Sequence, residues 1–367
     1  MSKRIAAALS LAALGIFSAT VAFSGDTPKM SAGSVNLKSA GAIAFTPDGT
    51  LLVGDSTAAQ VVAIDVNDRK AAKSGGNIDI TGVNEKAAAL LGTTPDQIMI
   101  QDVAVNPVSK HIYVSVSRGK GPDAAAVILR ADASGKLSMV SLDNVKHSSV
   151  SIPDALGPEV VDGRGQSQRV DTFTSLAYVN GNIVVAGVSN EEFNSTLHSI
   201  PYPFKDADKG VGIKIWHSSH KRFETQAPIR TFVPYSIDNK EYILAAYTCT
   251  PLVKIPVADL QAGAKVDGTT IGNLGEGNRP LDMIAYQKDG HNYFLVANSK
   301  WGVQKLTADN LGALQPITTP TDGPAGVHID TISELKDVQH LSKLDDSDAL
   351  LLVANGPNTE LRSIALP

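Results

Sequence analysis

Two aspartates, Asp102 and Asp282, are the residues of this chain whose types and positions most readily support chemistry. Each stands at the beginning of an apolar, strand-like segment, and Arg279 lies just upstream of the second. Asn298 and Asn355 end strand-like segments of the same kind. Carboxylate and amide oxygens are the ligands that a hard divalent cation takes, and arginine pairs with anionic groups. The set predicts a site for one divalent ion or for a small polar ligand.

A structural role is the alternative for the same side chains. An aspartate at the beginning of a strand commonly accepts backbone N–H groups, and asparagine commonly ends strands. Arg169, Arg230 and Arg279 lie upstream of three strand-like segments, where they would neutralise carboxylates and tie neighbouring elements together. Residue types alone favour this structural role over a ligand site.

Cys249 is the only cysteine and lies two residues after Tyr247. A sole thiol can act as a nucleophile or as a soft-metal ligand. No histidine lies within 25 residues of it in the sequence, which favours a buried structural thiol. His217 and His220 form a His-Ser-Ser-His segment. On a strand this spacing sends the two rings to opposite faces, so a shared metal ion would require a turn between them.

Other signatures of chemistry are missing from the sequence. It contains no Gly-x-Ser-x-Gly, no His-Glu-x-x-His, no phosphate-binding loop and no dinucleotide fingerprint. A single cysteine excludes a disulfide within the chain, haem attachment through Cys-x-x-Cys-His, and cysteine-rich zinc or iron–sulfur sites. The sequence therefore leaves open whether the protein is an enzyme.

The elements that must position these residues repeat along the chain. Residues 41–55 contain an apolar strand, a Pro-Asp-Gly turn and a second apolar strand, and residues 282–298 repeat this plan. Similar units are residues 102–115, 174–187, 231–247 and, with an insertion, 327–355. Equivalent positions are 51 to 71 residues apart. Repeats of this length, built from short strands and tight turns, predict an all-β fold, the β-propeller.

The pattern predicts six blades in one domain over residues 25–367, or seven blades if the gap between Val114 and Val185 holds another. Residues 84–91 and 333–344 interrupt the strands and predict two short helical insertions. In sequence order, the second and fifth of six units would face each other across the central channel. The positions that begin the innermost strands, at the channel mouth where propellers bind ligands, are Gly41, Asp102, Thr174, Thr231 and Asp282.

Two segments carry a resemblance to a known family. Gly-Ala-Ile-Ala-Phe-Thr-Pro-Asp-Gly-Thr-Leu-Leu-Val (residues 41–53) and Arg-Pro-Leu-Asp-Met-Ile-Ala-Tyr with Phe-Leu-Val-Ala-Asn (within residues 279–298) resemble the repeats of YVTN/NHL-type β-propellers. The resemblance covers most of the chain after residue 24 and implies an exported or extracellular binding module. Its wider relatives include lactonases, some of which hold a metal with an axial carboxylate and asparagine set. The Trp-Asp dipeptide of WD repeats and the tryptophan-per-blade pattern of quinoprotein dehydrogenases are absent.

Residues 1–24 predict a secretory signal peptide. Lys3 and Arg4 precede an uncharged run of about 17 apolar and small residues, and small residues follow at the expected cleavage site. The run is shorter than the ~20 residues that span a bilayer. We expect a periplasmic or secreted protein without membrane insertion of the mature chain. Without these residues the formal charge changes from −5 to −7, which disfavours nucleic acid and anionic membranes as partners.

The expected function is binding, as a ligand-binding or scaffold protein that uses its channel-mouth face for a small molecule or a periplasmic partner protein. The residues expected to bind are Arg279, Asp282, Asp102, Asn298, Asn355, Tyr247 and Cys249. One alternative is a lactonase-like hydrolase with one divalent ion on Asp102, Asp282, Asn298 and Asn355. The second alternative is a propeller subunit of a periplasmic redox system, similar to the propeller chain of amine dehydrogenases. His217 and His220 are the other candidate metal ligands.

Overall fold

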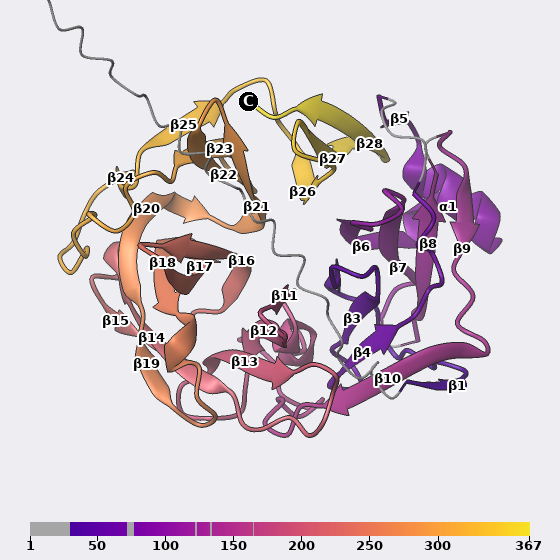
Figure 1. Cartoon of the computed structure of the whole chain (residues 1–367), viewed down its shortest axis with the longest axis horizontal. Helices are drawn as coiled ribbons and strands as arrows, with labels where there is room; N and C mark the ends of the chain where they lie inside the picture. The colour runs from indigo at the N-terminus through magenta and orange to yellow at the C-terminus, as the bar shows by residue number, and fades with distance from the viewer. Residues whose placement is uncertain (1–29, 72–76, 122, 133, 164) are drawn as a thin grey trace, which may run out of the picture.

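Six blades of mainly antiparallel strands surround a central channel in the computed structural model, which describes residues 30–367 except 72–76, 122, 133 and 164 (Figure 1). The predicted signal peptide lies outside the described residues. Each blade begins with a strand that lines the channel. In chain order these innermost strands define blades 1 to 6: β2 (Ile43–Phe45), β6 (Ile98–Val105), β11 (Ser175–Val179), β16 (Ile229–Ile237), β21 (Pro280–Lys288) and β26 (Val338–Lys343).

Blades 1 to 3 are built as follows, from the channel outward. Blade 1 continues with β3 (Leu51–Asp55), β4 (Gln60–Ile64), β10 (Val145–Ser151) and β1 (Ser31–Gly33). Blade 2 continues with β7 (Ile112–Arg118), β8 (Ala125–Ala131) and β9 (Leu137–Met139). Blade 3 continues with β12 (Asn182–Val188), β13 (Ser195–Pro201), β14 (Val211–His217) and β15 (Arg222–Glu224), and β19 (Lys265–Asp267) pairs in parallel with β14.

Blades 4 to 6 follow the same plan. Blade 4 continues with β17 (Lys240–Tyr247), β18 (Cys249–Pro256), β20 (Thr269–Asn278) and β24 (Ala325–Gly326). Blade 5 continues with β22 (His291–Asn298), β23 (Gly302–Thr307) and β25 (Ile329–Ile332). Blade 6 continues with β27 (Asp348–Asn355), β28 (Asn358–Ala365) and β5 (Asp79–Ile80).

The hydrophobic core consists of apolar layers between neighbouring blades. The second strand of a blade is buried on both faces, which explains why β3 and β17 read as continuous apolar runs rather than as alternating ones. One such layer joins Leu51 of blade 1 to Tyr113 of blade 2. Another joins Val114 of blade 2 to Leu352 of blade 6 and closes the ring.

The blades do not follow one another in sequence order around the ring. Innermost strands contact one another in the order β2, β11, β16, β21, β26, β6 and back to β2, so blade 2 lies between blades 1 and 6 (Figure 1). Two outer strands produce this order: β5 joins blade 6 before the chain enters blade 2, and β10 returns to blade 1 afterwards. The expectation that the second and fifth units face each other across the channel is therefore wrong, because only blade 6 separates them.

One of the two expected helical insertions is present. Helix α1 (Val83–Leu91) ends at Gly92, and short 3₁₀ turns occur at Pro95–Gln97, Gln168–Thr172, Ser218–His220 and Val257–Asp259. The helix expected at residues 333–344 is wrong, because this segment contains β26, whose Val338 and Leu341 are buried against blade 5. The gap expected to allow a seventh blade holds strands of blades 1 to 3 instead. Within the described residues, no helix combines the length and apolar character needed to cross a bilayer.

Candidate functional site

A shift in strand register precedes the same position in four innermost strands. The pairing of β6, β16, β21 and β26 with their neighbours skips one residue, as a β-bulge does. The residues that follow the shift are Asp102, Thr231, Asp282 and His340, and all four line the channel cavity. In blade 3 the register gives the equivalent position to Ser175 rather than to Thr174, and in blade 1 to Ala42 rather than to Gly41.

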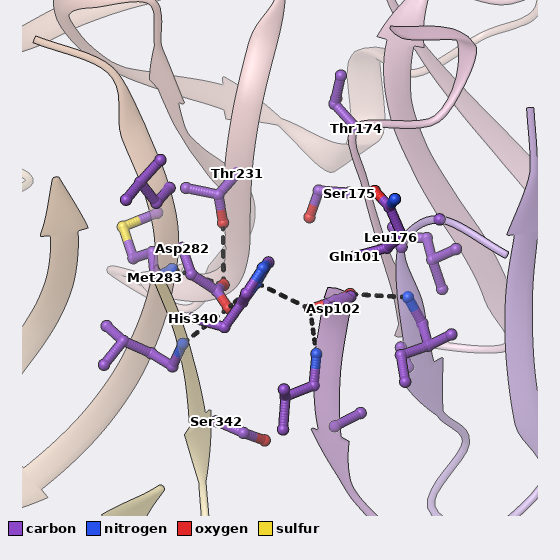
Figure 2. A pocket seen from close by; sticks show the side chains of 18 of the residues that line it. Gln101, Asp102, Thr174, Ser175, Leu176, Thr231, Asp282, Met283, His340 and Ser342 are labelled. Carbon is purple, nitrogen blue, oxygen red and sulfur yellow. Dashed lines mark hydrogen bonds and ion pairs between the residues drawn. The ribbon is translucent and has the colours of Figure 1, made fainter. Parts of the chain in front are cut away.

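His340 lies between the two aspartates that the sequence singled out (Figure 2). Its Nδ1 atom is 3.3 Å from Oδ1 of Asp102 and 3.7 Å from Oδ2 of Asp282. The three residues come from the three consecutive blades 2, 6 and 5, so the non-sequential order of the blades creates this contact. Because Nδ1 faces the carboxylates, Nε2 is the ring atom left to meet a ligand.

Both carboxylates also hold the backbone of neighbouring blades. Asp102 Oδ2 accepts a hydrogen bond from the Ile43 N–H of blade 1 at 2.8 Å. Asp282 Oδ2 accepts one from the Leu341 N–H of blade 6 at 3.0 Å. Each aspartate accepts a further bond from the N–H of the next residue, Val103 or Met283. These bonds fit the structural role considered for strand-initial aspartates and occupy much of the carboxylates' accepting capacity.

The charges at this site are strongly coupled. Burial disfavours the protonated imidazole, but the adjacent Asp102 and Asp282 carboxylates outweigh it and raise the pKa of His340 to about 10. Burial, together with the negative charge of Asp102, raises the pKa of Asp282 above its usual value. At neutral pH His340 is therefore an imidazolium that can donate a hydrogen bond from Nε2.

The cavity around His340 has a volume of 490 Å³ and is rich in hydrogen-bond donors. Arg230 and Arg279 line it, and one guanidinium nitrogen of Arg230 donates to Asp171 Oδ1 at 3.0 Å. Gln101 and Ser175 line it as well (Figure 2). The carboxylates of the cavity already accept protein hydrogen bonds, so the groups left for a ligand are mainly donors.

The remaining predicted ligand-binding residues lie apart from this cavity. Asn298 is buried, accepts a hydrogen bond from Asn278 at 2.6 Å, and borders a different cavity. The Asn355 amide donates to Glu360 at 2.7 Å in the hairpin of blade 6. Tyr247 is fully buried in the layer between blades 3 and 4. The structure thus joins Asp102, Asp282 and Arg279 in the channel and leaves these three elsewhere.

Cys249, His217 and His220 form a second cluster, between blades 3 and 4. A potential ligand atom of each lies within 4.8 Å of those of the other two. Residues 218–220 form a 3₁₀ turn, which supplies the turn that the His-Ser-Ser-His segment requires. Burial, followed by the charges of Glu224 and Glu276, raises the pKa of the Cys249 thiol, which makes it a poor nucleophile at neutral pH.

His340 is the site residue that sequence reasoning missed. The repeat pattern begins the sixth unit at Val327, whereas the innermost strand of blade 6 begins at Val338. A signal was available, because Gln-His-Leu at residues 339–341 stands where blade 2 has Gln-Asp-Val at residues 101–103. The strand itself lacks an apolar run, because Val338 and Leu341 are its only apolar residues.

Comparisons with known proteins return distant propellers. No protein-family model matches the chain, and a search of curated proteins finds no match, so the YVTN/NHL resemblance stays a prediction. A PQQ-bound aldose sugar dehydrogenase from Streptomyces coelicolor is 12% identical, with a TM-score of 0.32, over 93% of this chain and 99% of that one. A glucose dehydrogenase is 11% identical, with a TM-score of 0.39, over 93% and 100%. The β-propeller domain of Myceliophteria thermophila Cps50 (Swd1) is 9% identical, with a TM-score of 0.39, over 92% and 100%.

Proposed function

We propose that the protein is an exported binding protein that holds a small, acceptor-rich molecule, such as a hydroxylated carboxylate, at the mouth of its central channel. The observation that carries this proposal is the position of His340 between Asp102 and Asp282, with Nε2 left free of the two carboxylates. The carboxylates keep the imidazole charged and oriented. The imidazolium then donates to an anionic oxygen of the ligand, which is a strong, charge-assisted hydrogen bond.

The rest of the cavity supports the same ligand chemistry. The guanidinium group of Arg279 adds positive charge to the cavity, whereas that of Arg230 is paired with Asp171 at 3.0 Å. Ser175 and Gln101 add polar groups for hydroxyls. A cavity of 490 Å³ has the size of a pocket for a small molecule. A cationic ligand would meet few free acceptors, since Asp102 and Asp282 already accept backbone N–H groups.

The test is calorimetric titration of the full chain with a panel of small molecules that differ in charge: a neutral sugar, the corresponding sugar acid and an amino sugar. We expect the acid to bind, and His340→Gln to weaken its binding at least tenfold. His291→Gln is the matched control, because His291 also pairs with an aspartate, Asp309, but lies on the exposed part of β22. Binding of the amino sugar alone, or unchanged binding by the His340 variant, would overturn the proposal.

The second candidate is a lactonase-like hydrolase with one divalent ion in the channel. It is favoured by one observation: ligand atoms of Asp102, Asp282 and His340 lie within 4.8 Å of one another. An ion held there would polarise a carbonyl and activate water. Elemental analysis after purification without chelator separates the two candidates. One divalent ion per chain that Asp282→Asn removes, with lactone hydrolysis lost in parallel, supports the hydrolase.

The proposal includes export of the chain and, for a scaffold or redox role, a protein partner. The basic and apolar run at residues 1–24 supports export, and the mature N-terminus recovered from the periplasm or the medium tests it. A scaffold role or a redox-subunit role predicts a second exported protein that co-purifies with the chain. Recovery of the chain from the cytoplasm with an intact N-terminus would contradict export.

A further inference from the structure

The cluster between blades 3 and 4 brings three potential metal ligands, from His217, His220 and Cys249, within 4.8 Å of one another. His217 ends β14 with an extended backbone, and the 3₁₀ turn Ser218–His220 that follows brings the ring of His220 back beside it. Their ring centroids are 3.9 Å apart. Cys249 begins β18 on the neighbouring blade, with a φ of 76° that residues other than glycine rarely adopt. Strain of this kind gathers at functional sites.

One carboxylate orients both imidazoles. Glu224 Oε2 lies 2.6 Å from Nδ1 of His217, and its Oε1 lies 2.7 Å from Nδ1 of His220. Arg222 donates to the same carboxylate at 2.8 Å and keeps it in place. With Nδ1–H of each ring directed at the carboxylate, the lone pairs available to an ion are on Nε2. Metal-binding histidines in proteins are commonly held by a carboxylate in this way.

His217 Nε2 has no hydrogen-bond partner although the side chain is only 1% exposed. A buried polar atom without a partner has lost its hydrogen bonds to water and gained none in return, so its presence needs an explanation. A metal ion bound to this nitrogen supplies the missing partner. The neighbouring His220 is 44% exposed and borders a surface cavity of 460 Å³, which gives an ion access to the cluster.

We propose that His217, His220 and Cys249 bind one copper or zinc ion between blades 3 and 4. Two imidazoles and a thiolate are borderline and soft ligands, which select these metals over calcium or magnesium. Among the described residues the cluster offers three protein ligands, so a bound ion keeps a position for water or for an external ligand. The thiol gives up its proton on binding, as a coordinating cysteine does. This site is separate from the channel and goes beyond the function proposed above.

The experiment titrates chelator-treated full chain with Zn²⁺ alone and with Cu⁺ alone, without oxygen and with a reductant that does not bind metals. We expect one equivalent of the preferred metal to bind and to protect Cys249 from a thiol-alkylating reagent. Cys249→Ser and His220→Gln should each weaken binding at least tenfold. Glu224→Gln, which alters only the orienting carboxylate, should weaken it 10- to 100-fold. His291→Gln is the control and should bind as the wild type does.

Two further outcomes decide the proposal. Charge-transfer absorption from the thiolate on loading with Co²⁺, lost in Cys249→Ser, would establish the cysteine as a ligand independently of affinity. Failure of both metals to bind stoichiometrically, or wild-type binding by Cys249→Ser, would overturn the site. Neither result bears on the channel, because Asp102, Asp282 and His340 are unchanged in all of these variants.

Discussion

The imidazole of His340 in blade 6 pairs with Asp102 in blade 2, at 3.3 Å between Nδ1 and Oδ1. Blade 2 lies beside blade 6 because the strands that flank it in the sequence belong to its two neighbours: β5 is the outer strand of blade 6, and β10 pairs with β4 of blade 1. This arrangement brings the two residues together. The contact joins the innermost strands of blades 2 and 6, which are neighbours in the ring. It therefore ties blade 2 to blade 6 and orients His340 in the channel cavity.

The stability of the protein should decline at alkaline pH because of His340. Its pKa is about 10 in the folded chain and about 6.5 when unfolded, so its stabilising contribution is complete below pH 6.5 and disappears as the pH rises towards 10. The facing groups are Asp102 and Asp282. Urea denaturation at pH 6 and pH 9.5 should show a larger loss for the wild type than for His340→Gln. Equal losses would mean that His340 titrates normally.

Asp282→Asn should lower the free energy of unfolding by about 2–3 kcal/mol, because it removes one counter-charge of His340 and weakens the bond to the Leu341 N–H. Thr231→Val removes only a long hydrogen bond of 3.5 Å to the same carboxylate and should cost less than about 1 kcal/mol. Chemical denaturation measures both. A reversed order would show that Asp282 does not tie blades 5 and 6.

Leu361→Ala should destabilise the protein by about 2–5 kcal/mol. Leu361 is fully buried on β28 and belongs to the apolar layer between blades 6 and 2, together with Val114 and Leu129. Leu90→Ala on the exposed side of α1 is the control and should change stability by no more than about 0.5 kcal/mol. A small effect of the Leu361 variant would argue against blade 2 as the neighbour of blade 6.

Gly187→Ala should cost about 3 kcal/mol or more, because a Cβ atom there would lie 1.9 Å from the carbonyl oxygen of Thr172. This contact packs β12 against the segment that leads into the innermost strand of blade 3. Gly163→Ala introduces a Cβ with no neighbour within 4 Å and should be tolerated. The thermal midpoints of the two variants, measured side by side, check the difference.

The repeat of apolar strands and turns predicted the six-bladed fold correctly, because the second strand of each blade is buried on both faces and reads as an apolar run. The order of the blades could not be predicted in the same way. It depends on β5, which has only two residues, and on β10, whose residues are mostly polar. Neither strand shows the repeat pattern. Sequence reasoning therefore placed Asp102 and Asp282 at the channel but on opposite sides of it.

The sequence predicted only part of each candidate site, and the reasons are similar. His340 was missed because only two of the six residues of its strand, Val338 and Leu341, are apolar, so the strand lacks the apolar run that marks the other innermost strands. The sequence did not predict that Cys249 lies beside His217 and His220, because these residues become neighbours only when blade 4 packs on blade 3. Asn298 ends strand β22 as expected, but its amide group bonds to Asn278 and Gln304 rather than facing the central channel.

The central claim is that Asp102 and Asp282 hold His340 as an imidazolium in the channel. NMR titration of the His340 ring nitrogens, assigned by comparison with His340→Gln, tests it most directly. We predict a pKa near 10 in the wild type and a lower pKa in Asp102→Asn, where one counter-charge is gone. A pKa near 6.5 in the wild type, unchanged by Asp102→Asn, would contradict the account.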